Sequence, residues 1–177
     1  MFCNSLIIGK LVDLKSVDES DAEFTMSIRN EPAVVQFLPR LTNTIEQQKE
    51  WIRKQRITNG DYFWVLLDKK GNRFGTIGVY DVNTNTPQGR SLAALGNPLQ
   101  NIEGVYLAYK YIFEELSVSN IYGWVYEDNI RAIRFDELLG GTIGKPREVE
   151  GRVIRDIVFN KAKFNIAGER IRKMIYR

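Results

Sequence analysis

The stretch EDNIRAIRFDELLGG, residues 127–141, indicates where a strand gives way to a helix and where that helix ends. The preceding residues, IYGWVYE, are rich in aromatic and β-branched side chains, which favour a buried strand. Within the stretch, apolar residues recur near helical spacing, and Gly140 suits the left-handed conformation that closes a helix. Asn129 is then either a purely structural N-cap or a cap that faces a ligand together with the first amides of the helix.

Composition limits the kinds of chemistry that this chain can perform. The 177 residues are 44% hydrophobic and 27% charged, which predicts one soluble globular domain, 1–177, with a substantial core. Because the chain has no histidine, Ser–His and Cys–His nucleophiles and His-ligated metal sites are excluded. A single cysteine, Cys3, allows no internal disulfide and no structural zinc site. We therefore expect no metal.

Charge and hydropathy also restrict location and partners. No apolar run reaches the roughly 20 residues that a membrane helix needs, and the N-terminus lacks the features of a secretion signal. A cytoplasmic protein without a membrane partner is therefore expected. The net charge is only +3, and the basic residues gather at the C-terminus in KAKFNIAGERIRKMIYR. That distribution is more typical of a solvated helix face than of a nucleic-acid-binding surface.

Hydrophobic periodicity and turn signals predict a mixed α/β (α+β) fold. The expected strands are 7–17, 61–68, 73–82, 90–97, 121–127, 142–148 and 152–160. The expected helices run from Asp18 or Ser20 to 29, from Thr44 to 57, from 102 to 116, and from Asn129 onward. This order predicts a mostly antiparallel sheet of about seven strands flanked by helices.

One pair of these strands is expected to be parallel. A crossover helix joins strand 90–97 to strand 121–127, so the two strands run in the same direction and end near the same edge. Pro98 lacks an N–H and must stop the first of them, which leaves backbone groups open beside two helix N-termini. Such an edge suits an extended molecule that carries amides and a pyrophosphate.

The chain resembles the GNAT superfamily of acetyl-coenzyme A (acetyl-CoA)-dependent N-acetyltransferases over nearly its whole length. EDNIRAIRF…LLGG is similar to the family's Asn-x-x-Ala-Ile stretch with its closing glycine. VDESDAEFTMSIRN and YFWV…GTIGVYDV resemble the branch of ribosomal-protein N-terminal and bacterial amino-sugar N-acetyltransferases, and LGNP before a helix ending FEEL resembles the amino-sugar enzymes.

The resemblance implies a single GNAT-like domain whose central parallel strands are splayed at the cofactor site. It implies acetyl-CoA as co-substrate and a primary amine as acceptor, on an amino-sugar nucleotide or on a protein N-terminus. A catalytically silent acyl-CoA-binding or scaffold protein on the same fold is the alternative. The sequence leaves a homodimer open.

The resemblance also assigns roles to particular residues. The residues expected to pair with the pantetheine amides are Leu95, Gly96 and Asn97. The amides expected to cradle the pyrophosphate are those of Ile102, Glu103, Gly104, Val105 and Tyr106. Asn129 is expected near the pantetheine and Arg134 near the phosphates, although Arg134 is equally consistent with a solvated helix charge. The expected walls of the acceptor pocket are Arg29, Asn30, Trp64 and Tyr80, with core packing an equal alternative for Trp64.

The chain departs from the family pattern at two points. QNIEGVY keeps one glycine of the usual pyrophosphate loop and puts the Glu103 carboxylate beside the expected phosphates. Asp136 stands where the family often has the tyrosine that protonates the leaving thiolate. We expect Asp136 to be an ionised surface charge, unless burial raises its pKa enough for it to act as that acid. No general base is evident, and a water relay to Asp81, Glu103 or Tyr80 is the expected substitute.

Overall fold

One sheet of eight strands runs through residues 6–176, the part of the chain that the computed structural model describes, in the order β1-β2-β3-β4-β5-β6-β8-β7. Cys3 lies outside these residues. The strands are β1 (Ile7–Ile8), β2 (Val12–Ser16), β3 (Tyr62–Asp68), β4 (Arg73–Tyr80), β5 (Gln88–Ala94), β6 (Asn120–Tyr126), β7 (Gly141–Val149) and β8 (Arg152–Asn160). The helices are η1 (Glu19–Asp21), α1 (Ala22–Arg29), α2 (Pro32–Val35), α3 (Ile45–Ile57), α4 (Pro98–Glu115), α5 (Ile130–Leu138) and α6 (Lys161–Ile175). None of the helices between residues 6 and 176 has the length and apolar character of a membrane span.

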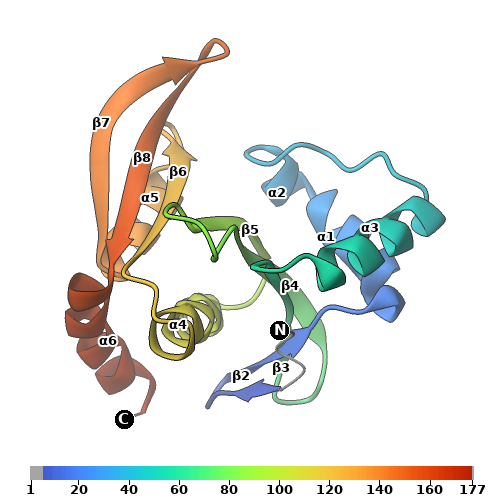
Figure 1. Ribbon diagram of the computed structural model, residues 1–177, viewed down its shortest axis with the longest axis horizontal. Coiled ribbons are helices and arrows are strands. Elements are labelled where there is room, and N and C mark those ends of the chain that lie inside the picture. Colours follow the sequence, from blue (N-terminus) through green and yellow to red (C-terminus); the bar gives the residue numbers. More distant parts are fainter. Residues whose placement is uncertain (1–5, 177) are drawn as a thin grey trace.

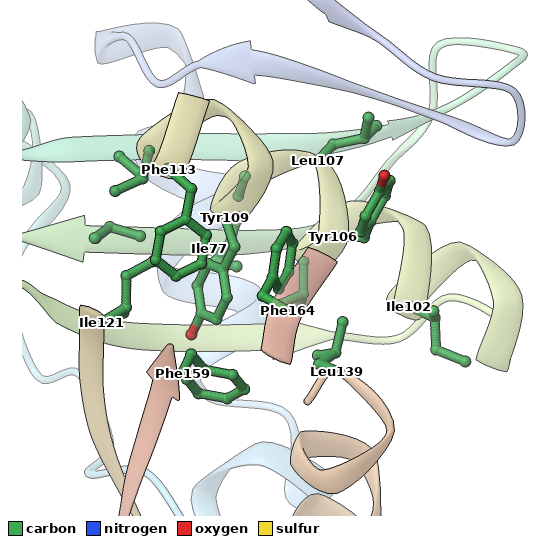
Figure 2. Close-up of a cluster of buried hydrophobic side chains, with 14 of the residues drawn as sticks. Ile77, Ile102, Tyr106, Leu107, Tyr109, Phe113, Ile121, Leu139, Phe159 and Phe164 are labelled. Atoms are coloured by element: carbon green, nitrogen blue, oxygen red, sulfur yellow. The ribbon is translucent and has the colours of Figure 1, made fainter. Parts of the chain in front are cut away.

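Helices cover both faces of the sheet, as the alternation along β3 requires. Trp64 and Leu66 pack into the larger core, which contains the buried residues of α4. Phe63 and Val65 point to the opposite face and pack against Ile52 of α3. Figure 1 shows α1, α2 and α3 gathered on one side of β3 and β4, with α4 on the other. In Figure 2 the aromatic residues of α4 meet side chains from β8 and α6, and the Tyr109 and Phe159 rings are 5.0 Å apart.

The sheet divides between β5 and β6, the parallel pair predicted from the crossover. Among the described residues, these strands pair only at Gln88 and Tyr122, and the Tyr122 N–H donates to the Pro87 carbonyl at 2.8 Å. Beyond that point β5 stays paired with β4, and β6 with β8. Figure 1 shows the two strands diverging. The edge of β5 that faces β6 is therefore left open along most of its length.

The N-terminal part of the sheet differs from the prediction. Residues 7–17 form two antiparallel strands, β1 and β2, rather than one, which is why the sheet has eight strands instead of about seven. A turn separates them, and the Gly9 N–H donates to the Val12 carbonyl at 2.9 Å. A Cβ at Gly9 would lie 2.6 Å from that carbonyl oxygen and from the Leu107 side chain, so only glycine fits this close approach.

The helices also differ from the prediction in two places. α4 begins at Pro98, four residues earlier than expected, because Asn97 and Gln100 form a capping box and proline is favoured in the first turn. The basic C-terminal segment forms α6, which the predicted element order lacked. One stripe of α6 is buried, including Phe164, Ile171 and Ile175, so the segment is a packed amphipathic helix rather than only a solvated one.

Candidate active site at the splayed strands

A cavity of about 150 Å³ lies between the diverging strands β5 and β6. Val105 and Tyr109 of α4 line it from one face of the sheet, and Leu38, just after α2, contributes to its wall. Trp124 of β6 also lines the cavity and is 46% exposed. The other lining residues are Ile77, Gly89, Leu92, Gly123, Asp136, Ile157 and Phe159. The cavity therefore joins the α4 side of the sheet to the segment that follows α2.

Asp136 is the carboxylate of this cavity, and the expectation of an ionised surface charge for it is wrong. Its neighbours Arg134 and Glu137 on α5 are exposed, whereas Asp136 turns inward toward the apolar wall that includes Ile157 and Phe159. Burial raises the pKa of Asp136 to about 7, because a carboxylate loses solvation there without gaining a cationic partner. Asp136 is therefore able to hold a proton near neutral pH.

Tyr109 shares the cavity with Asp136, and sequence reasoning did not select it as a site residue. Burial, and secondarily the negative charge of Asp136, raise the pKa of Tyr109 above its usual range, so its phenol stays neutral. A Cβ at Gly89 would overlap the Tyr109 hydroxyl, so glycine on β5 is what makes room for it. No local signal in the sequence distinguished Tyr109 from the other aromatic residues of α4.

The N-terminus of α4 offers fewer open amides than a phosphate-binding helix start usually does. The Asn97 N–H donates to the Gln100 side chain, and the Gln100 N–H donates to the Asn97 side chain, each at 3.0 Å. Pro98 has no N–H. Within the described chain, the Leu99 N–H is then the one donor of this first turn without a protein acceptor. The amides of residues 102–106 lie inside the helix and bond to carbonyls four residues earlier, so the expectation that they cradle a pyrophosphate is wrong.

Glu103 is fully buried and does not face a phosphate position. Its carboxylate accepts the backbone N–H groups of Lys10, Leu11 and Val12 at 2.8, 2.6 and 2.9 Å. The Tyr176 hydroxyl is a further donor at 3.4 Å. Glu103 thus binds the turn between β1 and β2 to α4. Because its oxygens are occupied, Glu103 is also unsuited to the water relay considered from the sequence.

Of the remaining residues expected near the cofactor, Leu95 and Gly96 lie just before α4, Asn129 caps α5, and Arg134 is exposed within α5. Asn129 caps α5, and its side-chain oxygen accepts the Ala132 N–H at 3.1 Å, so its structural role is established. The Leu95 N–H donates to the Phe74 carbonyl at 2.9 Å, which ties the end of β5 to β4. The Gly96 carbonyl accepts from the Asn101 side chain at 3.0 Å. The Leu95 N–H and the Gly96 carbonyl are thus already used within the protein. The backbone groups of β5 itself are the ones that face β6 without a partner strand beyond the Gln88–Tyr122 pair, within the described residues.

The four residues expected around the acceptor separate into two groups. Trp64 is only 1% exposed, and its ring lies 5.8 Å from that of Tyr62 inside the core, so its expected place in a pocket wall is wrong. Arg29 lines a cavity of about 160 Å³ between α1 and α3. Tyr80 lines a neighbouring cavity of about 460 Å³ together with Asp81. Asn30 holds the loop beside them, exchanging hydrogen bonds of 3.0 Å with the backbone of Leu41.

Comparison with known proteins agrees with this geometry. Residues 12–142 match the family model of the acetyltransferase (GNAT) domain, whereas a search of curated proteins finds no match. Among solved structures, the chain is similar to FdhC, described as a nucleotide-linked sugar GNAT, at 20% identity and a TM-score of 0.80, covering 97% of this chain and 99% of that one. It is also similar to spermidine N-acetyltransferase from Vibrio cholerae in complex with CoA and spermine, at 16% identity and a TM-score of 0.77, with coverages of 89% and 99%.

A third similar structure is a GCN5-related N-acetyltransferase from Brucella melitensis, at 13% identity and a TM-score of 0.77, covering 96% of this chain and 85% of that one. At these identities the structural likeness concerns the fold. The family match spans well over half of the chain, and the splayed parallel strands lie within the matched residues. The chain belongs to the GNAT acetyltransferase family.

Proposed function

We propose that this protein transfers the acetyl group of acetyl-CoA to a primary amine, on an amino-sugar nucleotide or on a protein N-terminus. The observation that carries the proposal is the cavity at the splay, where an open strand edge and a protonatable carboxyl group meet. The likeness to a nucleotide-linked sugar GNAT supports the amino sugar as the first acceptor to test.

The open edge of β5 would hold the amides of the pantetheine arm, in the way that a strand pairs with a neighbour. Asn129 and the first turn of α5 lie at the end of β6 beside this edge. Arg134 is exposed on α5 and would approach the phosphates from there. Bound acetyl-CoA would supply an activated acetyl thioester, and these residues would position it across the cavity.

Asp136 would supply the proton that the leaving thiolate takes up. In the reaction, a bond forms between the amine nitrogen and the acetyl carbon, the bond from that carbon to sulfur breaks, and the amine loses a proton to water. A thiolate whose conjugate thiol has a pKa of about 8.5 accepts a proton readily from an acid with a pKa near 7. Tyr109 is a much weaker acid because its pKa is raised. Asp136 is therefore the better proton donor.

A catalytically silent acyl-CoA-binding protein is the second candidate, and the start of α4 is the observation that favours it. The capping box and Pro98 leave the Leu99 N–H as the one open amide of that turn in the described chain. A helix start that binds pyrophosphate relies on several such donors. With so few donors, a bound acyl-CoA would be held loosely at its pyrophosphate, and on this reading the protein would bind it without positioning the thioester for transfer.

Two measurements on the same sample separate these candidates. Thermal melting with saturating acetyl-CoA should show stabilisation, since a ligand at 100 times its Kd adds about 2.7 kcal/mol. Release of free CoA thiol should then follow when glucosamine derivatives or N-terminal peptides are added. Stabilisation without thiol release supports the silent protein. An unmoved melting curve for the folded protein would remove the basis of both proposals.

A further inference from the structure

Arg29 is a half-buried cation that has no carboxylate partner among residues 6–176. It lies in the last turn of α1, and one of its terminal nitrogens donates to the Pro39 carbonyl at 3.0 Å. Its Nε is buried and has no acceptor, and no ion pair within the described chain includes it. Burial lowers the pKa of Arg29, with a smaller opposing effect from Tyr80. A guanidinium placed in this way lacks the partner that usually compensates a buried charge.

The cavity around Arg29 has one polar wall, formed by Thr25, Asn43 and Gln48, and its other lining includes the apolar side chains of Leu41 and Phe63. The Asn43 amide donates to the Gln48 side chain at 3.1 Å, and Gln48 donates to the Thr25 hydroxyl at 3.1 Å. The Thr25 hydroxyl donates in turn to the Ala22 carbonyl at 2.9 Å. This chain of bonds fixes the polar wall and occupies its groups. Arg29 itself lines this space of about 160 Å³, and its buried Nε is a donor without an acceptor in the described chain.

One short loop segment contributes to the walls of both this cavity and the cavity at the splay. Pro39, which accepts from Arg29, follows Leu38, which lines the splay cavity. Leu41, in the same segment, lines the Arg29 cavity and is held by Asn30. The short segment 38–41 therefore borders both spaces. An acceptor long enough to follow segment 38–41 from the splay would place another of its groups near Arg29.

We propose that Arg29 binds an anionic group, a phosphate or a carboxylate, on the acceptor molecule. This inference rests on the proposed function and narrows its acceptor to amines that also carry a negative charge. A guanidinium binds such groups through paired, charge-assisted hydrogen bonds. A polyamine such as spermidine has only cationic nitrogens and would be repelled by Arg29. The chain is thus expected to differ in acceptor from the spermidine N-acetyltransferase that shares its fold.

The test compares acceptors that differ in a single charged group. Glucosamine and glucosamine 6-phosphate differ in a phosphate, alaninamide and alanine differ in a carboxylate, and spermidine serves as the polycation. CoA thiol release is measured for the wild type, Arg29→Gln, Arg29→Lys and the control Arg53→Gln. Arg53 is an exposed arginine of α3 whose Nε pairs with Glu19 at 3.0 Å, away from the cavity.

The wild type should prefer the anionic member of one pair by about 10- to 100-fold in kcat/KM, and that pair identifies the anion as phosphate or carboxylate. Arg29→Gln should abolish the preference by raising KM, while Arg29→Lys should keep part of it and Arg53→Gln all of it. Equal use of both members of each pair, a preference for spermidine, or a preference unchanged in Arg29→Gln would overturn the inference.

A second readout does not depend on turnover. Inorganic phosphate and acetate are titrated while thermal melting is followed for the same variants. One of these anions should stabilise the wild type and Arg53→Gln but not Arg29→Gln. If no acceptor releases thiol, the proposed function fails, and the inference is then judged by this anion effect alone. Identical melting shifts in wild type and Arg29→Gln would overturn it.

Discussion

Replacement of Asp136 by asparagine should change how stability depends on pH. Burial raises the pKa of Asp136 from 3.8 to about 7, so between these values the folded protein holds a proton that the unfolded chain releases. The free energy of unfolding therefore falls as pH rises through this window, because the native state binds more protons. A difference of about three pH units corresponds to at most about 4 kcal/mol, since the side chain keeps some exposure.

Asparagine cannot ionise, so Asp136→Asn should lack this decline and should be more stable than the wild type above pH 7. The measurement is urea unfolding at a series of pH values from 4 to 9. Glu137→Gln serves as control because Glu137 is the exposed carboxylate next to it on α5, and this variant should keep the decline of the wild type. Parallel curves for wild type and Asp136→Asn would show that Asp136 is not buried in solution.

The same variant tests the proton donor. Loss of a positioned acid should lower the rate of acetyl transfer by about 10²- to 10⁴-fold. In the wild type, the rate should decline above pH 7 as Asp136 ionises, and this limb should be absent from the variant. Loss of the stability effect with a rate within a few-fold of the wild type would show a buried aspartate that takes no part in proton transfer.

Two further substitutions separate structural from binding roles. Glu103→Gln should lower the free energy of unfolding by about 2–4 kcal/mol, because a buried carboxylate that accepts three backbone amides loses its charge. Urea unfolding measures this loss, and Glu114→Gln, at an exposed position on the same helix, is the control. A loss for Glu103→Gln no larger than the control's would contradict that role. Asn129→Ala should lower the free energy of unfolding by about 1 kcal/mol through loss of the helix cap, and it should weaken the free energy of acetyl-CoA binding by more than that. Equal cofactor affinity in wild type and variant would show that Asn129 acts only as a helix cap.

The parts of the fold that could be predicted from the sequence depend on neighbouring residues. Thr44 and Gln47 form the expected capping box at the start of α3. Asn129 caps α5, and Gly140 after it has a φ of +86°. The parallel β5–β6 pair followed from the length of the connection between them. In each case the cause lies within a few residues or in chain connectivity, both of which are visible in a sequence.

The site could be predicted only in part because its properties depend on distant contacts. Glu103 binds amides more than 90 positions earlier in the chain, and nothing near it in sequence announces that turn. The burial of Asp136 depends on how α5 is rotated against β8, which helical periodicity alone did not settle. Arg29 was expected in a pocket wall, but whether an acidic side chain of the described residues reaches it depends on how α1 and α3 pack, which the sequence does not show.

The departure from the family pattern in the expected pyrophosphate segment has consequences for cofactor binding. At the start of α4, Asn97 and Gln100 use each other's backbone amides, and further along Glu103 is occupied by the β1–β2 turn. These groups serve the protein's own structure, so little of the affinity for the phosphates can come from α4. We propose that the affinity for acetyl-CoA would then come mainly from the open edge of β5 and from α5, where Asn129 and Arg134 lie. Substitutions on α5 should therefore affect acetyl-CoA binding more strongly than substitutions in the first turn of α4.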